Sequence, residues 1–144
     1  MNYEQRRTWL CQQLDKDAIV IVVGNTAKTR SKNINYHFRC DNDLYYLTGF
    51  SEPNSVAVIR PHHEKQYILF TRQNDAKAET SFGKRAGLIG AVENYQADLA
   101  YDINVLNQTL PLLLEDRTKV YYFDEQRLYQ SEIFQWINIY RKNT

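Results

Sequence analysis

Hydrophobic residues follow two patterns along the chain, and the continuous pattern predicts strands. Residues 18–23, AIVIVV, form an unbroken and mostly β-branched run, which is typical of a strand buried on both faces. Residues 55–60 and 66–71 form two further runs, and the five residues between them fit a hairpin loop, so this pair is expected to be antiparallel. Residues 119–123 predict another strand.

The second pattern spaces hydrophobic residues three or four apart, which predicts helices with one buried face. It occurs in residues 3–15, 99–113 and 129–140, and residues 76–82 predict a shorter helix capped by Asp75 or Asn74. Pro111 cannot donate a backbone hydrogen bond to Asn107, so the helix of residues 99–113 is expected to kink or break near Leu110.

Residues 91–95 predict one more short strand, after a loop that contains Gly83, Gly87 and Gly90. The order is then helix, strand, hairpin, helix, strand, helix, strand, helix. This order indicates an α/β fold with a mixed sheet flanked by helices. At 144 residues the chain can form one domain with a full hydrophobic core.

The segment from Arg30 to Pro53 follows neither pattern. Its sequence, RSKNINYHFRCDNDLYYLTGFSEP, mixes aromatic with charged residues, and the aromatic residues are Tyr36, Phe38, Tyr45, Tyr46 and Phe50. A short extended or helical piece is expected near residues 44–47. Two interpretations stay open: the rings are core residues among paired polar groups, or they form a working surface.

Composition and charge exclude several classes of function. The net charge of +1 gives no overall field that would attract nucleic acid or an anionic membrane. No hydrophobic run approaches the ~20 residues of a membrane span, and the first residues lack the apolar region of a signal peptide. Cys11 and Cys40 lack CxxC spacing, so we expect two buried thiols in a cytoplasmic protein.

The residues that could carry chemistry form no complete catalytic set. His62 and His63 lie in the predicted hairpin loop as solvated turn residues, and no HExxH pattern surrounds His37. The serines lack the GxSxG pattern of a hydrolase nucleophile, and residues 82–90 lack the GxxxxGK[ST] spacing of a phosphate loop. The residues therefore predict no catalytic group and no metal site in this chain.

Asp41 and Asp43 could share one face of a strand and act as an acid–base pair. The nearby Arg30 and Arg39 favour structural ion pairs instead. We expect the guanidinium of Arg39 to be partly buried and held by Asp43 or Glu52, because arginine is suited to bidentate pairing with a carboxylate.

Two motifs carry a resemblance to a known family. The first comprises Arg30-Ser31, Tyr36-x-Phe38-Arg39 and the run DLYYLTGFSEP of residues 43–53. The second is Ala78-Glu79-x-x-Phe82-Gly83-x-Arg85-x-Gly87. Together they resemble the amino-terminal domain of the Xaa-Pro aminopeptidases (aminopeptidase P) of the creatinase/prolidase group, and the resemblance covers essentially the whole chain.

The resemblance implies a six-stranded mixed sheet flanked by helices, with an outline like that of ribonuclease H. It also implies that residues 1–144 are a single N-terminal domain of a larger peptidase. In that family two manganese ions bind in a carboxy-terminal pita-bread domain, which is absent from this chain, and activate the water that attacks the bond before proline. This chain alone is therefore expected to be inactive and to hold no metal.

The implied roles of the domain are to cover the active-site cleft, to shape the entry of the peptide substrate and to support a homo-oligomer, either a dimer or a tetramer. The candidates for the substrate cleft or the domain interface are Arg30, Asn33, Tyr36, Arg39, Tyr45, Tyr46 and Ser81. If Tyr45 and Tyr46 are extended, one ring is expected to point to the core and the other outward.

Three positions depart from the family pattern. Ser81 stands where tryptophan is common, Asn33 where an acidic residue is usual, and Cys40 where glutamine is usual. Ser81 cannot stack on a neighbouring subunit's site as a tryptophan would. An alternative from a different class is a stand-alone binding module that has this fold and no peptidase activity.

Overall fold

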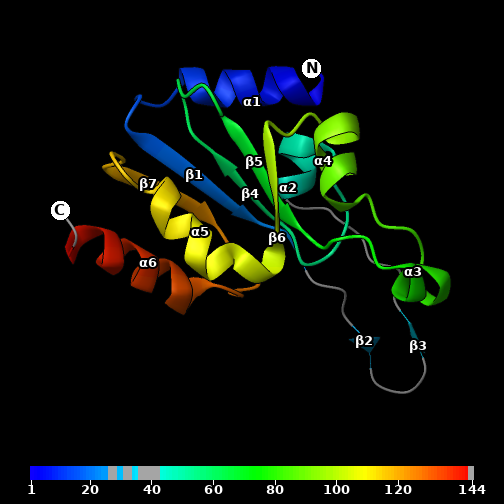
Figure 1. The fold of residues 1–144 in the computed structure, drawn as a ribbon. Coiled ribbons are helices and arrows are strands. Elements are labelled where there is room, and N and C mark those ends of the chain that lie inside the picture. Colours follow the sequence, from blue (N-terminus) through cyan, green and yellow to red (C-terminus); the bar gives the residue numbers. More distant parts are fainter. Residues whose placement is uncertain (26–28, 31–33, 36–42, 143–144) are drawn as a thin grey trace.

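The computed structural model describes residues 1–25, 29–30, 34–35 and 43–142, and it shows a sheet with helices on both faces (Figure 1). The sheet has five strands in the order β6-β5-β4-β1-β7. They are β1 (Ala18–Val23), β4 (Val56–Ile59), β5 (Tyr67–Thr71), β6 (Leu99–Asp102) and β7 (Lys119–Phe123). The antiparallel pairs are β1–β4 and β4–β5, and the parallel pairs are β1–β7 and β5–β6. The expected mixed sheet and its β4–β5 hairpin are confirmed.

The central position of β1 follows from its sequence. All six residues of AIVIVV are buried, because each face of the strand lies under a different layer of helices. Ile19, Ile21 and Val23 belong to one hydrophobic cluster, and Val20 and Val22 belong to the other. Each such side chain contributes about 1.5–3 kcal/mol on burial, so the strand fixes the middle of the sheet.

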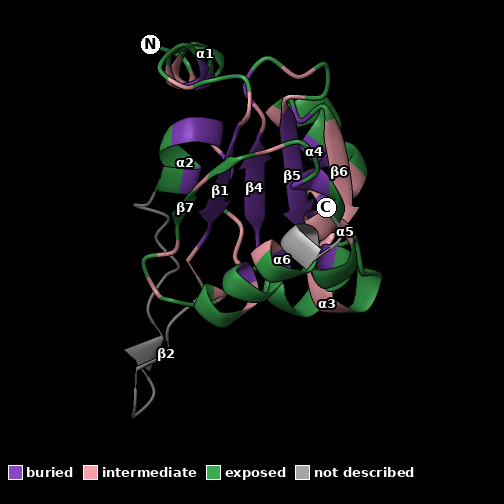
Figure 2. Ribbon diagram, turned by 90° about the vertical axis from the view of Figure 1, so that its left-hand side faces the viewer, coloured by how far each residue is buried: buried purple, intermediate pink, exposed green. Residues whose placement is uncertain are grey.

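The described residues form six α-helices: α1 (Tyr3–Gln12), α2 (Asp43–Thr48), α3 (Ala76–Phe82), α4 (Gly87–Tyr95), α5 (Leu106–Leu113) and α6 (Gln130–Lys142). Five of them form one layer on each face of the sheet. One layer holds α5 and α6, which contribute Leu106, Leu110, Ile133 and Trp136 to the first cluster. The other layer holds α1, α2 and α4, which contribute Cys11, Leu44 and Ala91 to the second. Helix α3 lies at the margin and buries no residue (Figures 1 and 2).

Several sequence-based element predictions are wrong in detail. The sheet has five strands rather than six, and the short strands β2 (Thr29–Arg30) and β3 (Ile34–Asn35) pair with each other in a separate two-stranded sheet. The predicted strand of residues 91–95 is part of α4, because its residues continue the turns that begin at Gly87. The first helix ends at Gln12 rather than at residue 15.

The predicted helix of residues 99–113 is two elements. Its first four residues form β6, because this segment pairs with β5 in parallel register. The Asp102 carboxylate then accepts a hydrogen bond from the Asn104 amide at 2.9 Å, which starts the short 3-10 helix η1 (Ile103–Val105) ahead of α5. Helix α5 continues past Pro111 and ends at Leu113.

Helix α1 is attached to the sheet by a buried arginine. The Arg7 side chain is 5% exposed, and its guanidinium lies 4.5 Å from the centre of the Tyr67 ring. It donates hydrogen bonds to the Leu47 carbonyl at 3.0 Å and to the Gln96 side-chain oxygen at 2.9 Å. Arg7 therefore joins α1 to α2, β5 and the end of α4.

Two buried groups that can lose a proton, Cys11 on α1 and Tyr67 on β5, predict that the domain loses stability at high pH. Burial raises the pKa of Tyr67 to about 12 from its ordinary 10.0, and raises the pKa of Cys11 to about 11 from 9.0. Between pH 9 and pH 12 the unfolded chain loses these protons while the folded chain keeps them, so the free energy of unfolding falls as the pH rises. Urea unfolding measured across this range should show Tyr67→Phe reducing the slope. A slope for Tyr67→Phe equal to that of the native chain would contradict the assignment.

Candidate functional site

The DLYYLTGFSEP segment forms α2 and the turn after it, and its conformation follows from a few contacts. The Thr48 hydroxyl donates to the Leu44 carbonyl at 2.6 Å and accepts from the Phe50 amide at 3.0 Å, which closes the helix. Gly49 adopts φ +73°, and a Cβ there would lie 2.6 Å from the Tyr3 ring, so only glycine fits this close approach. The turn places Phe50 in the core, where its ring packs edge-on against Tyr95.

Tyr45 and Tyr46 are both exposed, at 42% and 51%. The expectation that one ring points inward applied to an extended segment, and the segment is helical, with Leu44 and Leu47 on its buried face. The Tyr45 ring lies 6.0 Å from the Tyr3 ring. Tyr45 and Tyr46 therefore lie at the surface and Phe50 is a core residue, and the interpretation of the two tyrosines as a working surface stays a prediction.

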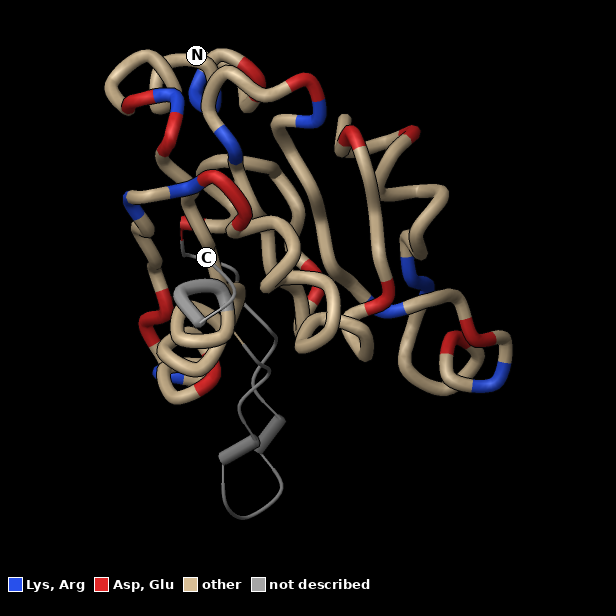
Figure 3. Tube along the Cα trace, turned by 60° about the vertical axis from the view of Figure 1, so that its left-hand side comes forward, with Lys and Arg blue, Asp and Glu red and all other residues tan. Residues whose placement is uncertain are grey.

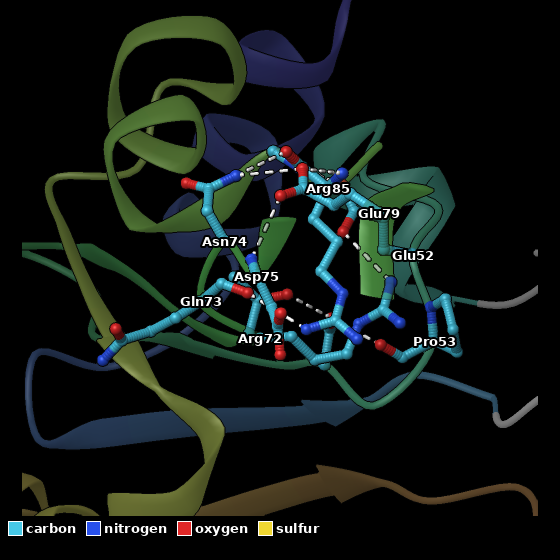
Figure 4. Close-up of polar contacts among 11 residues, drawn as sticks. Glu52, Pro53, Arg72, Gln73, Asn74, Asp75, Glu79 and Arg85 are labelled. Atoms are coloured by element: carbon cyan, nitrogen blue, oxygen red, sulfur yellow. Dashed lines mark hydrogen bonds and ion pairs between the residues drawn. The ribbon is translucent and has the colours of Figure 1, made fainter. Parts of the chain in front are cut away.

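Glu52 joins this segment to two others. One of its carboxylate oxygens accepts from the Arg72 guanidinium at 3.3 Å, and the other accepts from the Ala86 amide at 2.8 Å (Figure 4). Arg72 is therefore a partner of Glu52 that the sequence did not indicate. Arg39 lies outside the described residues, as do Asn33 and Tyr36 and the side chain of Arg30, so their roles stay predictions.

Glu79 holds the segment between α3 and α4 in a similar way. Its carboxylate accepts from the Arg85 amide at 2.8 Å, from the Asp75 amide at 3.0 Å and from the Asn74 side chain at 3.3 Å. The hydrogen bond from the Arg85 amide is the largest cause that lowers the pKa of Glu79. Asp75 caps α3 as expected, through the amides of Lys77 and Ala78.

The glycine at the end of the second motif is required by the same contacts. Gly87 adopts φ +70°, and a Cβ on it would lie 1.9 Å from the side-chain oxygen of Asn74. The Asn74 amide group donates to the Arg85 carbonyl at 2.9 Å, and the Arg85 guanidinium donates to the Gln73 carbonyl at 3.1 Å. We call the residues Glu52, Arg72, Asn74, Glu79 and Arg85 the polar cluster.

The polar cluster borders an open hollow of about 480 Å³. The residues that line it include Arg72, Arg85, Asp102, Asn104 and Tyr129, which directly precedes α6. The hollow presents both donors and acceptors, which suits the backbone of an extended peptide better than an apolar ligand. Figure 3 shows that Lys and Arg positions are interspersed with Asp and Glu positions along the described trace, without a separate segment of one charge sign.

Helix α3 stands out from the body of the protein next to this hollow (Figure 1). Ser81 is exposed, as a cleft residue would be, and Phe82 beside it is 87% exposed. Because α3 buries no residue, the contacts of Glu79, Asn74 and Arg85 fix its orientation. Phe82, Arg72 and Glu79 are not among the site residues expected from the sequence, although Glu79 and Phe82 belong to the AExxFGxRxG motif.

The family model for the aminopeptidase P N-terminal domain matches residues 3–122. The chain belongs to this family. The Xaa-Pro aminopeptidase of Haemophilus influenzae is 31% identical over 85% of the chain, and intermediate cleaving peptidase 55 of Saccharomyces cerevisiae is 35% identical over 86%. The solved structure of Pseudomonas aeruginosa aminopeptidase PepP superposes with a TM-score of 0.89, at 34% identity over 97% of the chain.

This aminopeptidase P N-terminal domain spans only part of each relative. It covers 29% of the Haemophilus protein, 25% of the yeast protein and 32% of the Pseudomonas chain. Among the described residues, no group of three or more His, Cys, Asp or Glu side chains could hold a metal ion, so the manganese expected for the family has no fitting site there. In the same part of the chain, no helix is long and apolar enough to cross a membrane.

Proposed function

We propose that this chain is the non-catalytic N-terminal domain of a manganese-dependent Xaa-Pro aminopeptidase, an enzyme that removes the N-terminal residue preceding proline. The family match over residues 3–122 carries the proposal. The relatives are three to four times as long as the matched region, which leaves room for a separate catalytic domain. The two manganese ions and the groups that act on the peptide bond belong, in this proposal, to that following domain.

The contribution of the present domain is to cover the catalytic cleft from one side. Helix α3 is suited to this role because it projects from the body with Ser81 and Phe82 exposed and is held by charged hydrogen bonds. A preorganised wall costs less to order on substrate binding than a mobile one. Tyr45 and Tyr46 supply exposed rings on α2, and tyrosine is a residue type that interfaces favour. We further propose a cytoplasmic homo-oligomer that acts on peptides.

The first test asks whether residues 1–144 are active alone and whether they belong to a longer protein. The chain of residues 1–144 should retain no stoichiometric manganese after dialysis and should not cleave an Xaa-Pro peptide, as measured by elemental analysis and a peptidase assay with added manganese. An antibody against the domain should detect a native protein roughly three times the 17.1 kDa of the chain. Turnover by the chain alone would refute the proposal, and a native protein of 17.1 kDa would indicate a stand-alone binding module instead.

The second test asks whether α3 covers the catalytic cleft. In the longer protein, Phe82→Ala should lower kcat/KM for Xaa-Pro peptides by about tenfold, a loss of about 1.4 kcal/mol in transition-state stabilisation. Its stability should change by less than about 0.5 kcal/mol, because the side chain is at the surface. Ile89→Ala is the matched control, since Ile89 is 71% exposed on α4. If the two variants have equal kinetics, α3 does not line the cleft.

A further inference from the structure

A second hollow lies where the first turns of α1 meet the start of β5 and the segment that joins α4 to β6. Its volume is about 310 Å³, and every residue that lines it carries a polar group: Glu4, Arg7, Thr8, Gln66, Tyr67, Gln96 and Asp98. The hollow beside α3 borders the other ends of β5 and β6, and Figure 1 shows α1 and α3 at opposite ends of the fold. The two hollows are therefore separate.

The wall of this second hollow contains a buried positive charge. The Arg7 guanidinium donates only to uncharged acceptors, the Leu47 carbonyl and the Gln96 side-chain oxygen. Within the described part of the chain, no carboxylate forms an ion pair with it. Burial is the largest effect on the pKa of Arg7 and lowers it, so the surrounding groups do not fully compensate the charge.

Two carboxylates line the same hollow. Glu4 is exposed in the first turn of α1, and no described residue forms an ion pair with it. Asp98 uses its Oδ2 atom to accept a hydrogen bond from the Tyr67 amide at 2.8 Å. Both carboxylates are close enough to Arg7 to raise its pKa, against the larger effect of burial. The hollow thus combines one buried cation with two anionic groups.

We propose that this hollow binds a free α-amino acid in its zwitterionic form, with the ligand carboxylate on Arg7 and the ligand ammonium between Glu4 and Asp98. A simple anion would meet two like charges in the hollow, and a simple cation would leave Arg7 without a partner. An α-amino acid carries both charges on one carbon atom, and the guanidinium fork matches the geometry of a carboxylate. The volume is at the lower end for small-molecule sites, which suits a single amino acid better than a longer peptide.

A ligand on Arg7 also acts on the packing of the domain. Arg7 connects α1 to the Leu47 carbonyl of α2 and to the Tyr67 ring of β5, so binding at its guanidinium stabilises this attachment by mass action. The binding itself does not depend on the peptidase proposal. Its role does rest on that proposed function, because the residue that an aminopeptidase releases is an α-amino acid, and the site would then respond to the product.

The two charges of the ligand can be tested separately by isothermal titration calorimetry of the purified chain at constant ionic strength. L-Alanine should bind, whereas alaninamide lacks the carboxylate and N-acetylalanine lacks the ammonium. Each of these two analogues should bind about tenfold more weakly or worse, because each loses one set of charged hydrogen bonds. No binding of alanine, or equal binding of all three compounds, overturns the proposal.

A substitution locates the site without disturbing Arg7. Glu4→Gln keeps the size of the side chain but removes its charge, and it should weaken the Kd for alanine by about tenfold or more. Glu93→Gln, the same change at an exposed residue of α4, is the matched control and should leave the Kd unchanged. Equal urea midpoints would show that both variants are folded.

Alanine binding that Glu4→Gln leaves intact would remove the ligand from this hollow and refute the proposal. The outcome is distinguishable from that of the peptidase proposal. Binding to the chain without Xaa-Pro cleavage by the longer protein would refute the proposed function alone. Cleavage by the longer protein without binding of alanine to the chain would refute the amino-acid site alone.

Discussion

Replacing Phe50 with alanine should lower the free energy of unfolding by about 3–5 kcal/mol, as expected for a large ring removed from a packed core. Phe50 has no exposed surface, and its ring packs edge-on against Tyr95 with centroids 4.9 Å apart. It ends the turn that begins at Thr48, so the cavity would open where α2 meets the second hydrophobic cluster. Urea unfolding followed by circular dichroism measures the loss.

Phe82→Ala is the control for this experiment, because it removes the same ring from a position that is 87% exposed. Its unfolding midpoint should be close to that of the native chain. If Phe50→Ala lowered the free energy of unfolding as little as Phe82→Ala, packing in the core would not explain why the family motif contains Phe50, and a binding role would explain it better.

Arg7→Met should destabilise the chain by about 2–4 kcal/mol. Methionine fills much of the same volume but leaves the Leu47 carbonyl without the donor it has at 3.0 Å, and a buried carbonyl without a partner costs about 1–3 kcal/mol. The contact of the guanidinium with the Tyr67 ring would also be lost, and desolvated contacts of this kind contribute about 2 kcal/mol. Differential scanning calorimetry of the purified chain would give the change.

The neighbouring Arg6 offers a matched comparison. Its guanidinium lies 4.5 Å from the centre of the Tyr46 ring and donates to the Tyr46 carbonyl, and both contacts are at the surface. Arg6→Met should therefore cost less than about 1 kcal/mol. Similar losses in the free energy of unfolding for Arg6→Met and Arg7→Met would show that the burial of Arg7 is not the reason why its contacts stabilise the packing of α1.

The strands were predictable where the chain itself is uniformly apolar. The run AIVIVV has no polar residue, so every register buries it, and its central place in the sheet could be inferred. The hairpin of β4 and β5 was predictable for the same reason. The spacing of Leu99 and Ile103 led to the wrong prediction of one helix over residues 99–113, because a strand followed by a tight turn gives a spacing of four as well as a helix does.

The polar cluster could not be derived from local patterns. Glu52 meets Arg72 and the Ala86 amide, which lie 20 and 34 positions further along the chain. The sequence suggested only the nearer Arg39, with Asp43 or Glu52 as its partner, and that pairing stays a prediction because Arg39 lies outside the described residues. The sequence also left open whether residues 44–47 are extended or helical, because α2 has only six residues and its period cannot be read from the sequence.

The parallel pairing of β1 with β7 has a consequence for synthesis on the ribosome. The residues of β1 leave the exit tunnel early, and their β7 partners follow about 100 residues later. At ordinary elongation rates of 5–20 residues per second, that interval lasts about 5–20 s. Until then one side of a wholly apolar strand has no neighbour, so the nascent chain presents a binding site for chaperones that the finished domain conceals.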